Sequence, residues 1–409
     1  MKKALVLCGG EPQIALIKYL KSKDITVILA DMNENVAGRA YADIFYPVSV
    51  LDVAKVEEVA IAEKVDFVVT VCADQVLEVV AKIAEKLGLP WYINAQTAEN
   101  VSKKSYMKEI FTRNNVPTSK YVILQEYEEK ALQGLKFPLI VKPVDAYSSR
   151  GVCKVTDYAQ LRTAFMNALQ ISRSKGVIIE EFVVGDELTV DVYVENGKAH
   201  VLSIMRLDKI GEDGKFVIHR SRYPADINAE IERKIEEAAQ SIADAFELKN
   251  SPMLIQLITD GENISVVEFC ARTGGGVKFR LIKRVSGFDV VQAVADFCLG
   301  IIPHYENKGR LKRYITNEFL YCRTGEFDKI TGLEELHREG IINAYYIIKK
   351  HGHVFEDIRS SGDRVAYYTI EADTLSEMQS KRLQANAKIK ALSTNGEDLL
   401  RHDLIIKNL

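Results

Sequence analysis

The sequence predicts a multidomain protein of the α/β and α+β class, and three observations support this prediction. Residues 1 to about 95 alternate short apolar runs with helical patterns, which is typical of an α/β domain. The middle of the chain carries hairpin patterns, and the segment after about Leu311 mixes strand and helix patterns. With 409 residues the chain exceeds one ordinary hydrophobic core, so two or three domains are expected.

The N-terminal part is predicted to contain a parallel sheet. Ala4–Cys8, Thr26–Ala30 and Phe67–Val71 are continuous apolar runs, as in parallel strands covered on both faces. Ligand-facing loops are then expected at the carboxyl ends of these strands. Gly9-Gly10 and Asp31 stand at two such ends, but no G-x-G-x-x-G pattern is present. A tight strand-to-helix turn is therefore favoured over a dinucleotide site.

Helices and a half-buried strand are predicted in the middle of the chain. A linking helix is expected over Lys103–Asn115 and a second helix over Tyr158–Ile171. Glu187–Val194 alternates apolar and polar residues, which predicts a half-buried antiparallel strand ending in an Asn196-Gly197 hairpin turn. Apolar residues between Ile231 and Phe246 recur at helical spacing, so an amphipathic helix follows.

A second hairpin and a capped helix are predicted further along. Met253–Thr259 and Ile264–Cys270 form the hairpin strands, with the turn over residues 260–263. The last long helix is expected to open with a capping box formed by Thr374 and Glu377.

Composition narrows the classes of function. Hydrophobic residues make up 47% of the chain and charged residues 27%, as in soluble globular proteins. The formal charge of −3 argues against a dedicated nucleic-acid or membrane-surface binder. No apolar run approaches a membrane span, and the apolar N-terminal stretch is too short for a signal peptide. The six cysteines show no CxxC spacing, which argues against a zinc site or disulfides and predicts a cytoplasmic location.

Two lysines and a small-residue loop are candidate phosphate ligands. Lys142 ends an apolar strand, and Lys104 lies on the linking helix, so the two supply point charges for the α- and β-phosphates of a nucleotide. Ser148, Ser149 and Gly151 follow Lys142 in a loop whose amides and hydroxyls suit a terminal phosphate. A surface lysine and an ordinary turn remain the alternatives for these features taken singly.

Carboxylates after the next apolar strand are candidate nucleoside ligands. Glu180 and Glu181 precede Phe182, so one carboxylate and the Phe182 amide are expected to read the adenine edge. Glu187 is expected to hold the ribose hydroxyls. Paired glutamates after a strand are also often simply solvated.

The second hairpin holds the candidate metal site. Gln256 and Glu268 fall on adjacent antiparallel strands and can point to one face, and their oxygen ligands suit Mg²⁺. Arg272 can stabilise charge on a transferring phosphoryl group. Gly274 and Gly275, in a triple glycine, allow close backbone approach to a ligand.

Three further residues are candidates for binding a substrate. His219 and Arg220 belong to the basic segment 206–222, which either binds a substrate carboxylate or forms a solvated strand edge. Asp74 follows the third N-terminal strand and can face the same cleft. No P-loop, H-E-x-x-H, G-x-S-x-G or protein-kinase catalytic motif is present.

The order of these features resembles the ATP-grasp superfamily over nearly the whole chain. The resemblance is to its carbamoyl-phosphate synthetase-like and L-amino acid ligase-like branch, and it also extends to biotin carboxylase and glycinamide ribonucleotide synthetase. It implies a Rossmann-like pre-ATP-grasp domain over 1–100, a nucleotide-binding region over 101–310 and an α+β subdomain over 311–409. The nucleotide-binding region divides into a small lobe of about 121–185 and a large lobe of about 186–310. Carried over by motif, the phosphate, adenine, ribose and metal positions match the candidates above, and Arg272 matches the arginine of the family's E-x-N-x-R pattern.

Two departures from the family pattern concern the metal. The first ligand, often glutamate, is Gln256 here, as in carbamoyl-phosphate synthetase-like members. The asparagine of the family is replaced by Cys270, a soft ligand poorly suited to Mg²⁺. One of the two usual metals is therefore expected to be held more weakly, or mainly by phosphates and water.

The resemblance implies a carboxylate–amine ligase that uses ATP and Mg²⁺, with Mn²⁺ as a substitute ion. A carboxylate becomes an acylphosphate, an amine attacks it to give an amide, and ADP and phosphate are released. Small-molecule acid and amine substrates are implied, and a homodimer is compatible with the family. Two alternatives stay open: an ATP-grasp synthetase with another acceptor (bicarbonate-activating or phosphoribosylamine-type), and a non-catalytic nucleotide-binding protein.

Overall fold

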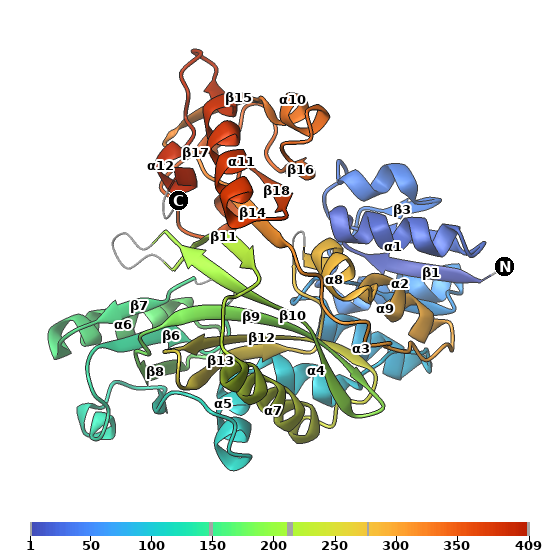
Figure 1. The fold of residues 1–409 in the computed structure, drawn as a ribbon. Coiled ribbons are helices and arrows are strands. Elements are labelled where there is room, and N and C mark those ends of the chain that lie inside the picture. The colour runs from blue at the N-terminus through green and yellow to red at the C-terminus, as the bar shows by residue number, and fades with distance from the viewer. Residues whose placement is uncertain (1, 147–149, 211–215, 276–277, 407–409) are drawn as a thin grey trace.

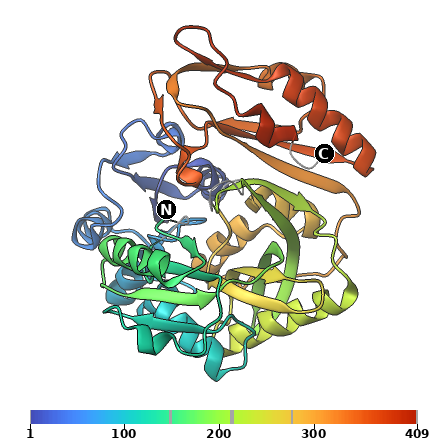
Figure 2. The same ribbon diagram turned by 90° about the vertical axis from the view of Figure 1, so that its left-hand side faces the viewer.

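The computed structural model describes residues 2–146, 150–210, 216–275 and 278–406 (Figure 1). The predicted phosphate-loop residues Ser148 and Ser149 lie outside the described residues, as does Gly276. Four sheets organise the described residues, and helices pack against them (Figures 1 and 2).

The N-terminal domain contains the predicted parallel sheet, with strand order β3-β2-β1-β4. Alternate residues of the first strand enter two separate cores: Ala4 and Val6 pack on one face, Leu5 and Leu7 on the other. Apolar side chains on both faces explain why the sequence pattern is continuous rather than alternating. The elements of this region are β1 (Lys3–Leu7), α1 (Glu11–Lys21), β2 (Thr26–Ala30), η1 (Ala37–Tyr41), β3 (Ile44–Tyr46), α2 (Val53–Glu63), β4 (Phe67–Val69), α3 (Leu77–Leu87) and α4 (Ala95–Ser102).

The Gly9-Gly10 segment is a tight turn closed by a second loop. The Gly9 amide donates to Asp31 Oδ2 at 2.9 Å, and a Cβ on Gly38 would lie 2.8 Å from the Gly9 carbonyl oxygen. Gly38 therefore packs directly against the Gly9 backbone, in agreement with the turn favoured from the sequence.

A small antiparallel sheet with strand order β5-β8-β6-β7 follows the linking helix. The predicted helix over Tyr158–Ile171 is confirmed as α6, and it begins where the Asp157 carboxylate accepts from the Gln160 amide at 2.8 Å. The elements are α5 (Lys104–Arg113), β5 (Tyr121–Leu124), η2 (Glu129–Leu132), β6 (Leu139–Pro143), β7 (Cys153–Val155), α6 (Tyr158–Ile171) and β8 (Val177–Glu181).

An eight-stranded sheet forms the centre of the molecule, with strand order β13-β12-β9-β10-β11-β14-β18-β16. Asn196 and Gly197 have positive φ angles of 50° and 86° and form the predicted hairpin turn between β9 and β10. The predicted second hairpin is confirmed as β12–β13. The elements up to residue 298 are β9 (Asp186–Glu195), β10 (Lys198–Lys209), β11 (Ile218–Tyr223), α7 (Ala229–Ala245), β12 (Ser251–Thr259), β13 (Ile264–Cys270), α8 (Lys278–Ser286) and α9 (Val290–Cys298).

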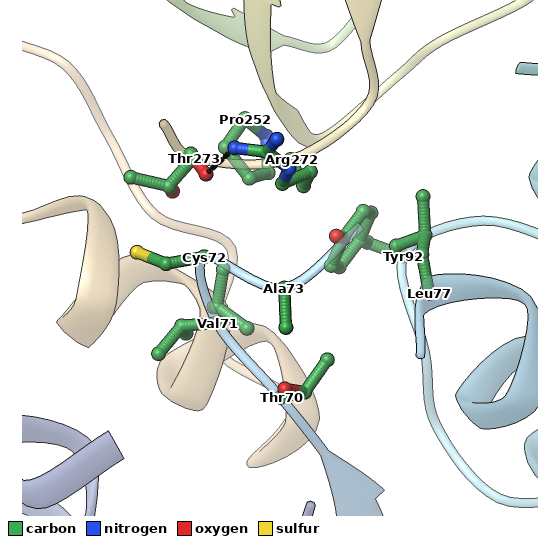
Figure 3. A pocket seen from close by; sticks show the side chains of 10 residues that line it. Thr70, Val71, Cys72, Ala73, Leu77, Tyr92, Pro252, Arg272 and Thr273 are labelled. Atoms are coloured by element: carbon green, nitrogen blue, oxygen red, sulfur yellow. Dashed lines mark hydrogen bonds between the residues drawn. The ribbon is translucent and has the colours of Figure 1, made fainter. Parts of the chain in front are cut away.

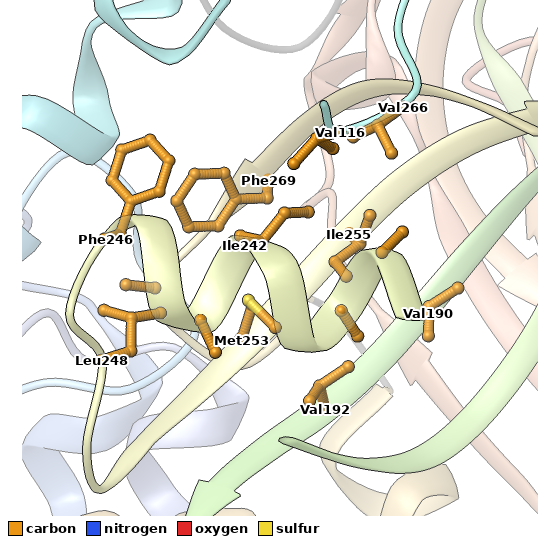
Figure 4. Close-up of a cluster of buried hydrophobic side chains, with 14 of the residues drawn as sticks. Val116, Val190, Val192, Ile242, Phe246, Leu248, Met253, Ile255, Val266 and Phe269 are labelled. Carbon is orange, nitrogen blue, oxygen red and sulfur yellow. The ribbon is translucent and has the colours of Figure 1, made fainter. Parts of the chain in front are cut away.

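The main core lies between α7 and one face of this sheet (Figure 4). Ile242 and Phe246 from the helix pack against Val192, Ile255 and Phe269 from the strands. The Phe246 and Phe269 rings are 4.5 Å apart. This packing holds β12 and β13, which carry the candidate metal ligands, in a fixed position.

The half-buried character predicted for β9 is wrong, because both faces of the strand are covered. Thr189, Asp191 and Tyr193 point away from α7, yet all three are buried. The second face packs against the region of α9 and the N-terminal domain, where the Tyr193 ring lies 4.6 Å from the ring of Phe288. The polar residues on this face therefore lie in the interior rather than in solvent.

The C-terminal segment continues the central sheet and adds a three-stranded sheet, β17-β15-β19. Half of the predicted capping box forms: the Thr374 hydroxyl accepts from the Glu377 amide at 3.2 Å, but the Glu377 carboxylate accepts from the Asp373 amide instead. The elements are β14 (Tyr314–Leu320), β15 (Gly325–Thr331), α10 (Leu333–Arg338), β16 (Ala344–Ile347), β17 (Val354–Phe355), η3 (Ser361–Asp363), β18 (Ala366–Ala372), α11 (Leu375–Lys388), β19 (Lys390–Ser393) and α12 (His402–Ile406). Among the described residues, no helix combines the length and apolarity that a membrane crossing requires.

Candidate active site

A cavity of about 690 Å³ lies where the small sheet, the central sheet, the N-terminal domain and the C-terminal segment meet. Its wall brings together side chains that lie between Asp74 and Arg364 in the sequence. The predicted site residues that line it are Asp74, Lys104, Lys142, Glu180, Glu181, Phe182, Glu187, Gln256, Glu268, Arg272 and Gly275.

The two predicted phosphate lysines enter the cavity from different elements. Lys104 begins α5, where its ammonium group lies 3.0 Å from Glu268 Oε2 and donates to the carbonyl of Ala146 at 3.1 Å. Lys142 is the residue before the last of β6 and pairs with the carboxylate of Glu180. In this structure each lysine is therefore held by an acidic side chain of the same cavity.

A third lysine, missed from the sequence, completes a buried charge cluster. Lys108 Nζ lies 2.7 Å from Glu180 Oε2 and also donates to the hydroxyls of Thr118 and Ser119 at 2.6 and 3.2 Å. Burial lowers the pKa of Lys108 to about 8, although the charge of Glu180 opposes this effect. Burial alone would raise the pKa of Glu180, but the charges of Lys142 and Lys108 lower it to about 2. Lys108 lies four residues after Lys104, so helical spacing is the signal that could have found it.

The predicted adenine contacts need correction. The Phe182 amide already donates to the carbonyl of Pro138 at 3.0 Å, so it is not available to a base. The Glu180 carboxylate lies between two lysines, and Glu181 accepts from the Lys136 amide at 3.0 Å. Val183 follows Phe182 in the cavity wall, and its amide donates to no backbone carbonyl within the described part of the chain.

Glu187 lies at the start of β9 and pairs with Lys209 on the neighbouring strand β10. Both side chains line the cavity, and the Lys209 ammonium group lies 4.9 Å from the centre of the Phe216 ring. The role of Glu187 in holding ribose hydroxyls remains a prediction.

Gln256 and Glu268 lie directly opposite each other on β12 and β13, and both line the cavity, as expected. Burial acts to raise the pKa of Glu268, but the charges of Lys104 and Lys142 lower it below its usual range. Glu268 is therefore ionised at neutral pH and suited to a cation. Cys270, in the same wall, has a pKa raised by burial, so it is present as a neutral thiol.

These two oxygen donors fit a Mg²⁺ ion that takes its other ligands from phosphates and water. Within the described residues, no group of three or more His, Cys, Asp and Glu side chains could hold a metal ion. Mg²⁺ characteristically binds one or two protein oxygens and keeps several waters, so the small donor set is compatible with it. The positive charge of Lys104 beside Glu268 makes the same part of the cavity suitable for phosphate oxygens.

Arg272 lies at the contact between the N-terminal domain and the central sheet (Figure 3). Its guanidinium pairs with the carboxylate of Asp74 and donates to the carbonyl of Thr273 at 2.7 Å. Figure 3 shows the segment from Val71 to Ala73 facing Arg272 across this contact. Asp74 lines the cavity and holds Arg272, and its role in binding a substrate remains a prediction.

The predicted carboxylate-binding cluster of His219 and Arg220 is wrong. Neither residue is among those that line the cavity, and Arg220 is 0% exposed. Arg220 lies on β11 between Asp208 on β10 and Glu318 on β14, and its Nε is 2.5 Å from Asp208 Oδ2. Since β11 is an interior strand, its charges are neutralised by neighbouring strands instead of facing a substrate.

Of the three predicted glycines Gly151, Gly274 and Gly275, one lines the cavity. Gly275 lines the cavity, whereas Gly274 lies beneath the side chain of Lys278, and a Cβ there would lie 2.4 Å from Lys278 Cδ. Gly151 has a φ of 77°, and a Cβ there would lie 2.8 Å from Ile171. The positive φ angle and the close packing against Ile171 explain why position 151 is a glycine. The role of Gly151 in binding a phosphate remains a prediction.

Several cavity residues could not be predicted from local patterns. Lys278 lines the wall beside Gly275, and its ammonium group donates to the hydroxyl of Thr189. From the C-terminal segment, Phe319 and Arg364 line the wall, with the Arg364 guanidinium 3.7 Å from the ring centre.

Comparison with known proteins agrees with this geometry. A family model described as an ATP-grasp domain matches residues 135–280. This chain contains an ATP-grasp domain. A second model, described as L-amino acid ligase C-terminal domain 2, matches residues 318–391. The predicted ATP-grasp resemblance and fold are therefore confirmed, while the exact domain boundaries remain predictions.

Relatives of this chain include named ligases. A D-alanine–D-alanine ligase of Cupriavidus pinatubonensis is 29% identical over 166 residues, which cover 38% of this chain and 50% of that protein. An alanine–anticapsin ligase of Bacillus subtilis is 28% identical over 245 residues, covering 54% and 51%. The matched part of the chain thus spans about half the length of these relatives.

The fold is also that of a solved structure. The crystal structure of an L-amino acid ligase from Bacillus licheniformis superimposes with a TM-score of 0.83 at 21% identity. The superposition covers 97% of this chain and 99% of that one. The likeness therefore extends from the N-terminal domain to the C-terminal segment.

Proposed function

We propose that this ATP-grasp protein is an ATP-dependent ligase that joins a carboxylate to an amine. A carboxylate attacks the terminal phosphate of ATP, which gives an acylphosphate and ADP. The amine then attacks the acyl carbon, the C–N bond forms, phosphate leaves and the amine loses a proton. Both substrates are small molecules, and amino acids are the class that the relatives favour.

The observation that carries the proposal is the arrangement around Glu268. This carboxylate lies opposite Gln256, is 3.0 Å from the ammonium group of Lys104 and lines the same cavity as Arg272. Oxygen donors, a lysine and an arginine in one wall suit a polyphosphate whose charge shifts during transfer. The L-amino acid ligase match over residues 318–391, which contribute Phe319 and Arg364 to the wall, supports an amine acceptor.

Gln256 and Glu268 are proposed to hold Mg²⁺, which would neutralise charge on the phosphate oxygens when bound. Lys104 and Lys142 would meet phosphate oxygens of ATP and exchange their present carboxylate partners for them. Each exchange replaces one ion pair by another, so no buried lysine is left without a counter-charge.

Arg272 is proposed to stabilise the negative charge of the acylphosphate. Its guanidinium is fixed by Asp74 and by the carbonyl of Thr273, so it is oriented before the substrate arrives. Preorganisation of this kind is the main way in which charge stabilisation accelerates phosphoryl transfer. The remaining contribution of the cavity is to bring the acid and the amine together.

The test is phosphate release from ATP and Mg²⁺ with a panel of amino acids, supplied singly and in pairs, with products identified by mass spectrometry. A product whose mass equals acid plus amine minus water supports the ligase. Release without an amide points to another acceptor such as bicarbonate. ATP binding with no release on any addition points to a non-catalytic nucleotide-binding protein.

A further inference from the structure

The buried carboxylate of Glu180 is shared by two lysines, one on each of its oxygens. Its Oε1 pairs with Lys142 on β6, and its Oε2 lies 2.7 Å from the ammonium group of Lys108 on α5. The Ser119 hydroxyl donates to the same Oε2 at 2.9 Å. One oxygen of Glu180 therefore has partners that do not depend on the contact made by the other oxygen.

The two lysines differ in what they can reach. Lys142 and Glu180 line the cavity, but Lys108 is not among the described residues of the cavity wall. Lys142 pairs with Ile178 across β6 and β8, which makes it a diagonal neighbour of Glu180 in the small sheet. Lys108 reaches the carboxylate from the linking helix and is 1% exposed. A ligand in the cavity can therefore meet Lys142, whereas Lys108 can affect that ligand only through Glu180.

Lys108 is held in place at the junction of α5 and the small sheet. Its ammonium group donates to the hydroxyls of Thr118 and Ser119 at 2.6 and 3.2 Å. The Thr118 hydroxyl donates in turn to the carbonyl of Val266 on β13 at 2.8 Å. An ammonium group has three N–H donors, and Glu180 and the two hydroxyls accept all three. The position of the Lys108 charge is therefore fixed without any ligand.

Three lysines and two carboxylates form the charge cluster in this part of the molecule. Lys104 lies 3.0 Å from Glu268, while Lys108 and Lys142 share Glu180. The cluster thus carries one positive charge in excess. Without Lys108 the two remaining lysines would be matched by the two carboxylates. The excess charge is what a phosphate group can use without leaving a buried carboxylate unpaired.

Binding of a phosphate at Lys142 would leave one oxygen of Glu180 without its lysine. The matching exchange at Lys104 leaves Glu268 to Mg²⁺, but Mg²⁺ is not proposed to reach Glu180. A buried carboxylate that loses its only counter-charge is strongly unfavourable. Lys108 prevents this outcome, because its charge already lies on the second oxygen of the same carboxylate.

We infer that Lys108 is a positioning residue for nucleotide binding, which neutralises Glu180 so that Lys142 can direct its charge to the phosphates of ADP or ATP. This inference rests on the nucleotide site of the proposed function. Lys108 touches neither the nucleotide nor the metal. It acts on the difference between two states, because Glu180 has two counter-charges in the free protein and one in the nucleotide-bound protein.

The test measures the dissociation constant of ADP with Mg²⁺, and separately that of adenosine, by isothermal titration calorimetry at pH 7. Lys108→Met is expected to raise the Kd for ADP by about tenfold or more, because Lys142 must then stay with Glu180. The Kd for adenosine, which has no phosphates, should stay unchanged. Lys103→Met is the matched control at an exposed lysine that pairs with Glu99, and it should bind ADP as the wild-type protein does.

A second variant removes the carboxylate together with its lysine. In the double variant Lys108→Met and Glu180→Gln, no carboxylate competes with phosphate for Lys142 at this position. The affinity for ADP should therefore return towards the wild-type value. A merely structural role of Lys108 would not be repaired by a second buried substitution, so this cycle isolates the coupling between the two residues.

The pH dependence of ADP binding by the wild-type protein is a readout that needs no variant. Burial lowers the pKa of Lys108 to about 8; the charge of Lys142 acts in the same direction, and those of Glu180 and Glu268 oppose it. Tyr121 on β5 completes the surroundings, with its ring centre 5.7 Å from the ammonium group. Above pH 8 the free protein loses this proton and nucleotide binding must restore it, so the Kd for ADP should rise by up to ~10-fold per pH unit. Lys108→Met should lack this rise.

The results distinguish a failure of this inference from a failure of the proposed function. Absence of ADP and ATP binding by the wild-type protein would refute the nucleotide site and the proposed function with it. Binding of ADP by Lys108→Met with wild-type affinity would overturn the role of Lys108 alone, as would an equal loss of affinity for ADP and adenosine. If Lys108→Met does not fold, a wild-type Kd that stays constant from pH 7 to 9.5, or a folded double variant with weak ADP binding, would overturn it.

Discussion

Replacing Lys108 by methionine should change how the stability of the protein depends on pH. Lys108 is 1% exposed and lies beside Glu180, with hydrogen bonds to Thr118 and Ser119. Methionine fills a similar volume without the charge. Glu180 keeps Lys142 and Ser119 as partners in the variant, so its carboxylate is not left isolated.

The magnitude follows from the pKa of Lys108, which falls from an ordinary value of 10.5 to about 8 in the folded protein. Below pH 8 both the folded and the unfolded chain carry the proton, so the cost of burying the charge is fully present. Between pH 8 and 10.5 the unfolded chain binds more protons, so the free energy of unfolding rises with pH. At ~1.36 kcal/mol per pH unit, the total rise is about 3 kcal/mol.

The assay is chemical denaturation of the wild-type protein and of Lys108→Met at intervals from pH 7 to 10.5. Subtracting the two free energies of unfolding cancels the groups that both proteins share. The difference should move by about 3 kcal/mol in favour of the wild-type protein as pH rises through this window. Lys103→Met, at an exposed lysine that pairs with Glu99, is the control and should follow the wild-type curve. Parallel curves for the wild-type protein and Lys108→Met would refute the reasoning.

Three other outcomes are expected. Glu268→Ala should abolish ADP release and leave the melting temperature within a few degrees of wild type; retained turnover would contradict the metal assignment. Asp74→Asn should lower kcat/KM by about tenfold or more through loss of the charge that orients Arg272, measured as ADP release, while Asp74→Glu should recover part of it. Arg220→Met should lower the free energy of unfolding by about 1–3 kcal/mol, because it removes the closest partner of the buried Asp208, which keeps Arg222 at 2.8 Å, yet substrate KM values should stay unchanged. A raised KM in a folded Arg220→Met protein would restore the substrate role given up above.

Local patterns predicted most of the fold because each strand and helix carries its own signal. Tyr158–Ile171 is predicted to the residue, since its apolar spacing and the Asp157 cap are both local. The second face of β9 was not predictable in the same way. Phe288, which covers it at Tyr193, lies almost a hundred positions further along the chain, and no local pattern reports such a neighbour.

The residues of the candidate site likewise differ in whether a local pattern could place them. Gln256 and Glu268 could be assigned to adjacent strands of one hairpin because both strands carry local patterns, but their direct pairing depends on a register shift between Gln256 and Leu257 that no local pattern indicated. Arg220 was misjudged because its partners Asp208 and Glu318 come from different strands, one of them far away in sequence. Lys278 gave no signal, since only the folded chain brings it to the cavity wall.

The pairing of β11 with β14 has a consequence for recombining this protein with its relatives. The region matched as an L-amino acid ligase C-terminal domain begins at residue 318, inside β14, and β14 is hydrogen-bonded to β11 along residues 220–223. A fragment that ends before β14 would expose the whole edge of β11, which favours aggregation. Chimeras should therefore cross over within residues 299–313, between α9 and β14, and the graft must reproduce the register in which Tyr223 faces Ile315. The two matched regions are adjacent in one sheet, so either can be exchanged only if the pairing between β11 and β14 is preserved.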